Sequence, residues 1–211
     1  MAIFYSAIFA SMRNKLANTV LYKRAQDGII RTKPDKVKNP RTEGQRQQRT
    51  KMAFICDLAR RMAPVITMGL CGKPARMTVY NEFVRRNIDA VQLDDLMQPS
   101  IELDKLICSE GILERPNLTA TGLDKDIEVQ KKKMPETALA ADNDRVYVGA
   151  YEEDCQEAQV FDCGDRNNEE AVNITLPAHW QREKTHLYLF VTNHSHRRSS
   201  KTFLLETTAK E

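Results

Sequence analysis

The amino-acid sequence predicts an α+β protein in which an N-terminal arm with a hairpin and a two-helix region precede an immunoglobulin-like β-sandwich. Three observations lead to this prediction. An Asp-Gly pair separates two short apolar runs near the start, and apolar residues then recur at three- and four-residue spacing. After residue 100 the pattern changes to short alternating runs divided by turn residues. We therefore expect three parts, at residues 1–38, 39–99 and 100–211.

The first part, residues 1–38, is predicted to be an arm and a hairpin. Asp27-Gly28 lies between the apolar runs Val20–Lys23 and Ile29–Arg31, and this pair is typical of a tight hairpin turn. The mixed apolar and polar residues before the hairpin predict a short helix or an arm. Lys33–Asn39 contains a proline and is expected to be an extended linker.

A long helix is predicted to begin in the segment Asn39-Pro40-Arg41-Thr42. Asn caps helices, Pro is tolerated at the first helical position, and Thr42 with Gln45 can form a capping box. Pro64 should end or kink this helix. One stripe of it carries Met52, Ile55, Cys56, Ala59, Met62 and Ala63.

The first two turns of this helix, Arg41–Arg49, are purely polar. A helix with a basic, polar end and an amphipathic end should project from its own core, which suits contact with another molecule. A second helix is expected to follow, packed against the first, until Asp94-Asp95 and Pro99 close the helical part. Its apolar face consists of Met77, Tyr80, Val84, Ile88 and Val91.

The last part, residues 100–211, is predicted to contain about seven strands, a spacing typical of an immunoglobulin-like or fibronectin-like sandwich. Trp180 is expected to plug one end of the sandwich core, and a ligand-stacking role is the alternative. The strands are expected near Lys105–Ser109, Ile127–Lys131, Arg145–Tyr151, Gln159–Cys163, Val172–Leu176, His186–Thr192 and Thr202–Glu206.

Charge is distributed unevenly along the chain, although the net charge is only +3. Residues 1–95 carry 18 Lys or Arg against 8 Asp or Glu, a formal charge of +10, and the remaining residues carry 14 against 21, a charge of −7. The basic residues either form a solvated surface or attract an acidic partner or nucleic acid. The residues predicted to bind a partner are Arg31, Lys33, Lys36, Lys38, Asn39, Pro40, Arg41, Thr42, Gln45, Arg46 and Arg49.

The sequence contains no complete catalytic signature, so we expect no enzymatic activity, no cofactor and no bound metal. The five cysteines are odd in number and widely spaced, which argues against a disulfide framework, and Cys56 and Cys108 are expected to be buried thiols. His194 and His196 would share one face of a strand, as metal ligands do, but Arg197 and Arg198 beside them favour a cationic turn. No Ser or Cys has a neighbouring His with an orienting acid, and no glycine loop of the phosphate-binding type is present.

Membrane spans and secretion are not predicted. No segment approaches the roughly 18 to 20 apolar residues that cross a bilayer. The apolar start, Met1–Ala10, has its basic residues after it, the reverse of a secretory signal. We therefore expect the protein in a cytoplasm, or in a particle assembled there.

Several short motifs resemble an uncharacterised protein family of similar length, a domain of unknown function widespread in Bacteroidetes and in their phages, including crAss-like phages. The resemblance extends to Leu176-Pro177 and the closing strands, and its most specific part is the Asn-Pro-Arg-Thr run. Family members usually begin with a glycine-rich stretch, where this chain has Ser11–Ala17. The residues that carry the resemblance are Asn18-Thr19-Val20, Gly28-Ile29-Ile30-Arg31, Pro34, Asn39-Pro40-Arg41-Thr42-Glu43, Gln45, Gln48-Arg49, Met77-Thr78 and Tyr80-Asn81.

The resemblance implies a virion component, such as a ring, neck, tail or capsid-associated structural protein that assembles as a homo-oligomer with other virion proteins. The N-terminal region would act as an arm and the helix Asn39–Met62 would dock on a partner. The alternative is a histone-like, architectural nucleic-acid-binding protein that uses the basic front half. An adhesion or carbohydrate-binding module is a third hypothesis.

Overall fold

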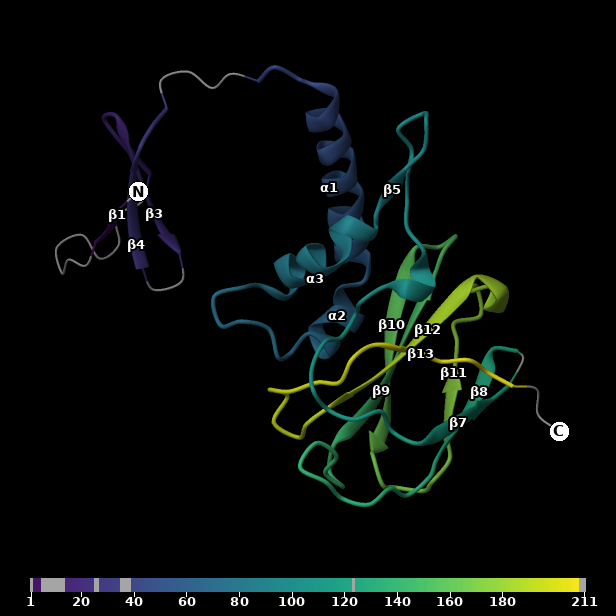
Figure 1. The fold of residues 1–211 in the computed structure, drawn as a ribbon. Helices are drawn as coiled ribbons and strands as arrows, with labels where there is room; N and C mark the ends of the chain where they lie inside the picture. The colour runs from purple at the N-terminus through teal and green to yellow at the C-terminus, as the bar shows by residue number, and fades with distance from the viewer. Residues whose placement is uncertain (1, 5–13, 25–26, 35–38, 123, 209–211) are drawn as a thin grey trace. The chain divides into compact units, whose positions relative to one another are not determined.

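A computed structural model of the chain describes residues 2–4, 14–24, 27–34, 39–122 and 124–208 (Figure 1). The model confirms the predicted α+β class, because it contains α-helices and several antiparallel sheets. The chain divides into two compact units, an N-terminal unit, Met1–Thr42, and a C-terminal unit, Glu43–Glu211.

The N-terminal unit is an antiparallel sheet of four strands in the order β1-β4-β3-β2. Each face of the central β3–β4 ladder carries one buried side chain, Leu21 on one face and Ile29 on the other. The core of this unit is therefore small among the residues that the structure describes. The strands are β1 (Ala2–Phe4), β2 (Asn14–Leu16), β3 (Thr19–Arg24) and β4 (Asp27–Thr32).

The β3–β4 hairpin exists, but its predicted turn at Asp27-Gly28 is wrong. Asp27 pairs with Arg24, so Asp27 and Gly28 belong to the second strand. The reason is the register, which places Leu21 opposite Ile30 and Tyr22 opposite Ile29. A turn at Asp27-Gly28 would have separated these apolar pairs. Of the predicted arm, residues 2–4 form a strand and residues 5–13 lie outside the described residues.

Helix α1 (Glu43–Arg61) begins later than predicted. The backbone of Arg41 has a φ of 51°, in the left-handed region that cannot continue into a right-handed helix. Asn39 and Pro40 therefore precede the helix instead of capping it, and Thr42 occupies the position directly before the first helical residue. The predicted break at Pro64 is confirmed, because α1 ends at Arg61 and α2 (Ala63–Gly69) carries Pro64 in its first turn.

The second predicted helix is α3 (Val79–Asn87), which packs against α1 as expected. The Thr78 hydroxyl accepts the amide hydrogen of Asn81 and caps its start. The Tyr80 hydroxyl donates to the carbonyl of Cys56 on α1. The predicted apolar faces are partly right, because Leu58 and Phe83 are also buried, whereas Met52 is 41% exposed.

A small hairpin, β5 (Gln92–Leu93) and β6 (Pro99–Ser100), follows a 3-10 turn, η1 (Ile88–Ala90), and was not predicted. The strand predicted at Lys105–Ser109 is absent, because a second 3-10 turn, η2 (Leu103–Lys105), precedes a stretch without ladder pairing. Side chains take the place of a neighbouring strand there. The amides of Cys108 and Ser109 both donate to the hydroxyl of Thr202.

Two antiparallel sheets make up the rest of the C-terminal unit. The four-stranded sheet has the order β10-β9-β12-β13 and the three-stranded sheet the order β11-β8-β7. The predicted strands from Ile127 to Thr192 are confirmed, β7 was missed, and β13 is shorter than expected. Their bounds are β7 (Leu118–Thr121), β8 (Asp126–Lys131), β9 (Arg145–Glu152), β10 (Glu157–Asp165), β11 (Val172–Thr175), β12 (Thr185–Thr192) and β13 (Phe203–Leu204), with η3 (Arg182–Lys184) before β12.

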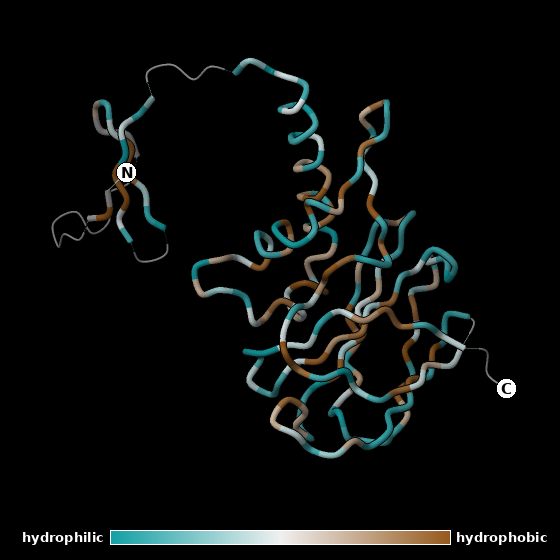
Figure 2. Tube along the Cα trace, viewed as in Figure 1, coloured by the Kyte–Doolittle hydropathy of each residue, from teal (hydrophilic) through white to brown (hydrophobic). Residues whose placement is uncertain are grey.

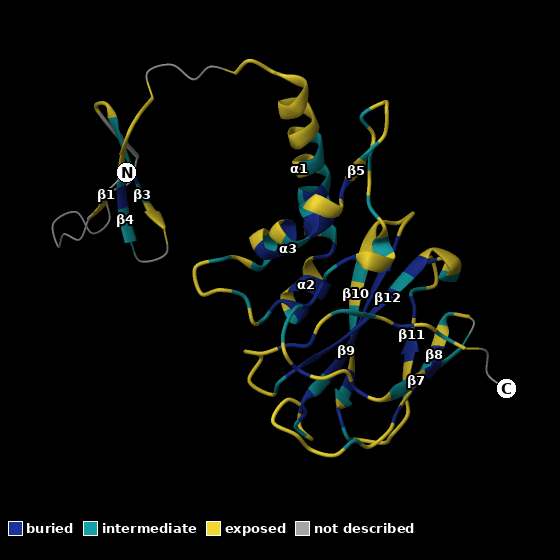
Figure 3. Ribbon diagram, in the orientation of Figure 1, coloured by how far each residue is buried: buried dark blue, intermediate teal, exposed yellow. Residues whose placement is uncertain are grey.

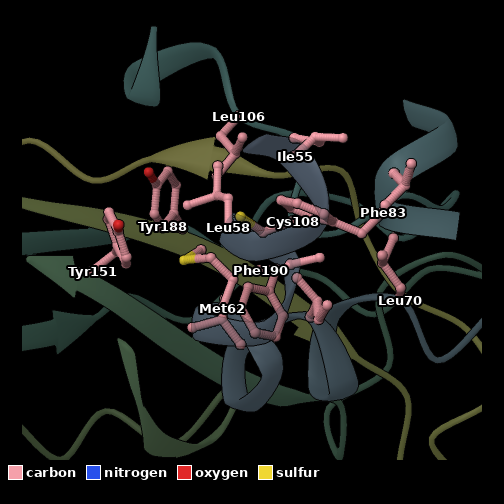
Figure 4. Close-up of a cluster of buried hydrophobic side chains, with 14 of the residues drawn as sticks. Ile55, Leu58, Met62, Leu70, Phe83, Leu106, Cys108, Tyr151, Tyr188 and Phe190 are labelled. Carbon is pink, nitrogen blue, oxygen red and sulfur yellow. The ribbon is translucent and has the colours of Figure 1, made fainter. Parts of the chain in front are cut away.

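The four-stranded sheet is the middle layer of the C-terminal unit, because both of its faces are covered. Tyr188 and Phe190 of β12 belong to one core between helices and sheet, together with Ile55 and Leu58 of α1 and Phe83 of α3 (Figure 4). The helices therefore share a core with the strands of the same unit.

On its other face, the middle sheet meets the three-stranded sheet in a second core. Val148 of β9 and Leu189 of β12 lie there with Ile127 and Val129 of β8. Trp180 is only 2% exposed in this core, and its indole N–H donates to the Glu157 carboxylate. Period-two alternation accounts for the arrangement, because successive residues of β9 and β12 face the two cores in turn.

Candidate partner-binding site

The N-terminal turns of α1 are the part of the predicted site that the structure holds in one place. All residues from Glu43 to Arg49 are exposed, whereas burial along the helix begins at Ile55. Figure 2 shows the same change as a hydrophilic start and a more hydrophobic end, and Figure 3 shows the exposed first turns. Gln45, Arg46 and Arg49 lie on these turns.

The charge of this helix end is positive from two sources. Arg46 and Arg49 are three residues apart, so they are neighbours on the helix surface. The partial positive charge that every helix carries at its N-terminus adds to theirs, and only Glu43 opposes it in the first turn. Both contributions have the same sign, so this end of α1 concentrates positive charge on an exposed surface.

The other residues predicted to bind a partner belong to the N-terminal unit, and two of them lie outside the residues that the structure describes. Arg31, Lys33, Asn39, Pro40, Arg41 and Thr42 are exposed there. The Arg31 guanidinium lies over the Tyr22 ring, 6.0 Å from its centre, at the outer limit of a cation–π contact. Lys36 and Lys38 lie outside the described residues. The eleven predicted residues are therefore divided between the two units.

A cleft of about 270 Å³ lies beside the C-terminal half of α1 and was not predicted. Asp57 and Arg61 of α1 form an ion pair of 2.7 Å on one wall. Residues 100–103 and the end of β9, with Tyr151 and Glu153, complete it, and burial raises the pKa of the Tyr151 hydroxyl. The lining comes from three distant segments, so no local sequence pattern could have identified it.

His186, next to this cleft, joins two carboxylates. Its Nδ1 lies 2.7 Å from Asp104 of η2 and its Nε2 lies 2.6 Å from Glu153. The neighbouring Tyr188 hydroxyl donates to the carbonyl of Leu103. These contacts fasten the segment around η2 onto β12, and they occupy both ring nitrogens of the histidine.

Cys155, the exposed thiol, lies in surroundings that do not activate it. Partial desolvation, a hydrogen bond with Glu152 and the nearby charges of Glu157 and Asp154 raise the pKa of the Cys155 thiol. A nucleophilic cysteine needs the opposite shift. Glu157 accepts hydrogen bonds from His179 and Trp180, which lower the pKa of its carboxyl group, so this acid stays ionised.

The His194-x-His196 pair lies in a turn and not on a strand. The Asn193 side chain accepts the amides of Arg197 and Arg198, and His196 has a φ of 49°. Its Nδ1 lies 3.2 Å from the Thr192 hydroxyl. Among the residues that the structure describes, no three His, Cys, Asp or Glu side chains are grouped as metal ligands. Within the same residues, no helix combines the length and the apolar character of a membrane span.

Comparison with known proteins identifies a family. A family model described as "Family of unknown function (DUF6266)" matches residues 12–204. The match covers most of the chain, so the protein belongs to this family. No curated protein matches the sequence.

Proposed function

We propose that this DUF6266 member is a non-enzymatic structural component of a phage virion, a ring, neck, tail or capsid-associated protein that acts through protein–protein assembly. The observation that carries the proposal is the exposed, positively charged end of α1, residues 43–49. Isolated helical turns are marginal in water, and tertiary packing supplies most helix stability in proteins. Turns that extend beyond their own core therefore suit docking on another molecule.

The N-terminal unit supports the same proposal. Its sheet has short strands and, among the described residues, one buried side chain on each face of the central ladder. For independent stability a sheet of three or more strands needs either a hydrophobic face or the cover of an element packed against it. A partner subunit could supply that cover, as arms do in assembled particles.

The C-terminal unit would provide the rigid body of such a component. Its two facing sheets, one of them backed by helices, agree with the proposal of an immunoglobulin-like sandwich, a module often used for decoration or adhesion. That inference is an analogy between folds. The resemblance described above supports an origin in Bacteroidetes or their crAss-like phages.

Size-exclusion chromatography with light scattering tests the proposal on the full chain, at low and moderate salt, with and without a random DNA duplex. The proposal predicts a discrete oligomer, or a complex with virion proteins, that is indifferent to DNA. A chain that stays monomeric and binds no virion protein would contradict it.

Nucleic-acid binding is the second candidate, and the residues that would contact phosphates are Lys33, Lys36, Lys38, Arg41, Arg46 and Arg49. Of these, Lys33, Arg41, Arg46 and Arg49 are exposed, and Lys36 and Lys38 lie outside the described residues. Six phosphate contacts would give a log–log salt slope of about −5 on duplex DNA. A slope near zero excludes this alternative, whereas a monomer or dimer that shifts only with DNA at low salt supports it.

A further inference from the structure

We propose that the C-terminal unit binds a second copy of the chain head to tail, with Leu96 of one copy inserted into a hollow of the next. Leu96 lies at the hairpin tip, defined as Asp94–Gln98 between β5 and β6. The hollow is the cavity of about 310 Å³ between the loops at residues 137–144 and 193–198. The inference rests on the assembly function proposed above and names a second copy as the partner.

The hairpin tip presents an apolar side chain on a firmly held turn. Leu96 is 80% exposed, and Figure 2 shows a hydrophobic stretch next to hydrophilic ones at this hairpin. One carboxylate oxygen of Asp94 accepts the amides of Leu96 and Gln98, and the amide of Met97 donates to the Asp94 carbonyl. Met97 has a φ of 63°, a conformation that costs free energy for a residue with a side chain. A turn fixed in this way loses little entropy when a partner binds.

The hollow offers an apolar wall and a polar wall. Leu113, Leu139 and Ala140 supply its apolar part, with Leu113 belonging to the core beneath. Thr137 and Ala140 exchange backbone hydrogen bonds across one loop. The Asn193 side chain fixes the other loop through the amides of Arg197 and Arg198. The cavity therefore exists before a ligand binds, at the small end of the range for binding pockets.

The charges of the two surfaces are opposite. Asp94 and Asp95 directly precede Leu96 at the tip, and Arg198 lies in the lining of the hollow. Asp144, the acidic residue in the lining, is buried and pairs with Arg166, whose Nε lies 3.7 Å from its carboxylate. Arg198 therefore supplies the exposed charge of the lining. A single exposed leucine is ordinary on a protein surface, but here a preformed hollow of matching polarity and opposite charge accompanies it.

The two surfaces lie at opposite ends of the middle sheet, so a molecule cannot satisfy its own contact. The base of the hairpin lies with Tyr151 and Glu153, where β9 ends, in the lining of the same cleft. The hollow includes Asp144 and Asn193, which lie directly before β9 and directly after the antiparallel strand β12. A contact between different surfaces of identical copies is heterologous and leads to a ring or an open filament.

Mixing two inactive variants of the full chain tests the inference by sedimentation velocity. Leu96→Asp removes the apolar side chain of the tip and leaves the hollow unchanged. Arg198→Glu reverses a charge in the lining of the hollow and leaves the tip unchanged. We expect each variant alone to weaken self-association about tenfold or more, as anchor residues do. An equimolar mixture should form a one-to-one dimer and stop there, because only one intact tip and one intact hollow can meet.

Two further variants make the result specific. Leu204→Ser, which changes a 36% exposed leucine of β13 outside both the tip and the lining of the hollow, should leave association unchanged. Asp95→Arg combined with Arg198→Glu should restore part of the association that Arg198→Glu removes. Assembly that persists in Leu96→Asp, or a mixture that stays monomeric while the wild type assembles, overturns the inference and leaves the assembly function standing. A wild-type chain that binds virion proteins but never itself also overturns only the inference.

Discussion

The side-chain amide of Asn87 hydrogen-bonds the backbone of Ile107 as a neighbouring strand would. The amide of Ile107 donates to Asn87 Oδ1 at 2.8 Å, and Asn87 Nδ2 donates to the Ile107 carbonyl at 3.0 Å. Asn87 is 1% exposed, and its Nδ2 also donates to the Phe83 carbonyl within α3. One buried amide thus joins the end of α3 to a segment twenty residues away.

Replacement Asn87→Asp should destabilise the protein by about 1–3 kcal/mol, because the carboxylate cannot donate and leaves two buried carbonyls without their hydrogen bonds. Urea unfolding followed by circular dichroism measures the change. Asn81→Asp, the same replacement at an exposed position in the first turn of α3, should be neutral or slightly stabilising. Equal effects of the two replacements would refute the role assigned to Asn87.

Gly149 permits the close approach of α2 to the middle sheet. A Cβ at this position would lie 2.6 Å from a methyl group of Val65. Gly149→Ala should therefore cost about 1–3 kcal/mol through overpacking. Adding Val65→Ala should recover part of that loss, and thermal unfolding of the single and double variants measures both effects.

Gly44 provides the matched control for Gly149. A Cβ at Gly44, in the first turns of α1, meets nothing within 4 Å. Gly44→Ala should be neutral or stabilising by less than about 1 kcal/mol, because alanine favours helix. A destabilising effect at Gly44 would contradict the open surroundings of this helix end.

Glu82 should make stability depend on pH in the acid range. Its buried carboxylate receives hydrogen bonds from Arg85 and Arg86, and chiefly the bond from Arg85 lowers the pKa of Glu82. A lowered pKa in the folded state stabilises the protein above the unfolded pKa of about 4.3, and this stabilisation disappears as pH falls through the folded pKa.

Glu82→Gln should therefore destabilise the protein at pH 7 and differ less from wild type as the pH falls below about 4. Urea unfolding at a series of pH values measures this difference. Glu102→Gln, at an exposed ion pair with Lys105, should show almost no effect at either pH. A Glu82→Gln effect that stays constant with pH would exclude the ionised carboxylate as its cause.

Charge reversal at the exposed end of α1 should weaken partner binding without unfolding the chain. Arg46→Glu with Arg49→Glu replaces positive charge by negative charge on turns that are exposed. We expect at least about a tenfold loss of affinity for an acidic partner, together with a weaker salt dependence. Surface plasmon resonance against the captured partner measures both, and circular dichroism checks the fold.

The matched control for this helix end is Lys132→Glu with Lys133→Glu, an equal change of charge on exposed residues after β8. This control should leave binding nearly unchanged. If it weakens binding as much as the α1 variant does, net charge and not the helix end governs association.

Local patterns predicted the strands that pair in regular ladders, such as β8, β9 and β12, because their residues alternate between two environments. They failed at Ile107 and Cys108, where the apolar pattern suggests a strand but the partners are side chains from Asn87 and Thr202. They also failed at Arg41, because a single residue with positive φ delayed the helix. Such interruptions depend on contacts that are distant in sequence.

The same limit applies to the candidate site. The polar start of α1 was predictable because seven successive residues, 43–49, lack any apolar side chain that a core could bury. The cleft beside Asp57 and the hollow beside Arg198 were not predictable, since each combines segments from separate parts of the chain. For the tip at Leu96, the sequence contained no indication of a binding surface apart from the two aspartates that precede the leucine.

The middle sheet, covered on both faces, also sets the order in which the chain can acquire structure. The core that contains Ile55 is complete only when Phe190 is present, and the core that contains Ile127 only when Leu189 is present. Contacts of such long range slow folding, because loops must close before burial compensates for the lost entropy. The sheet of the N-terminal unit needs only strands within its first 32 residues. On the ribosome the strands of that sheet are therefore complete early, whereas neither core of the C-terminal unit can close until β12 has been synthesised.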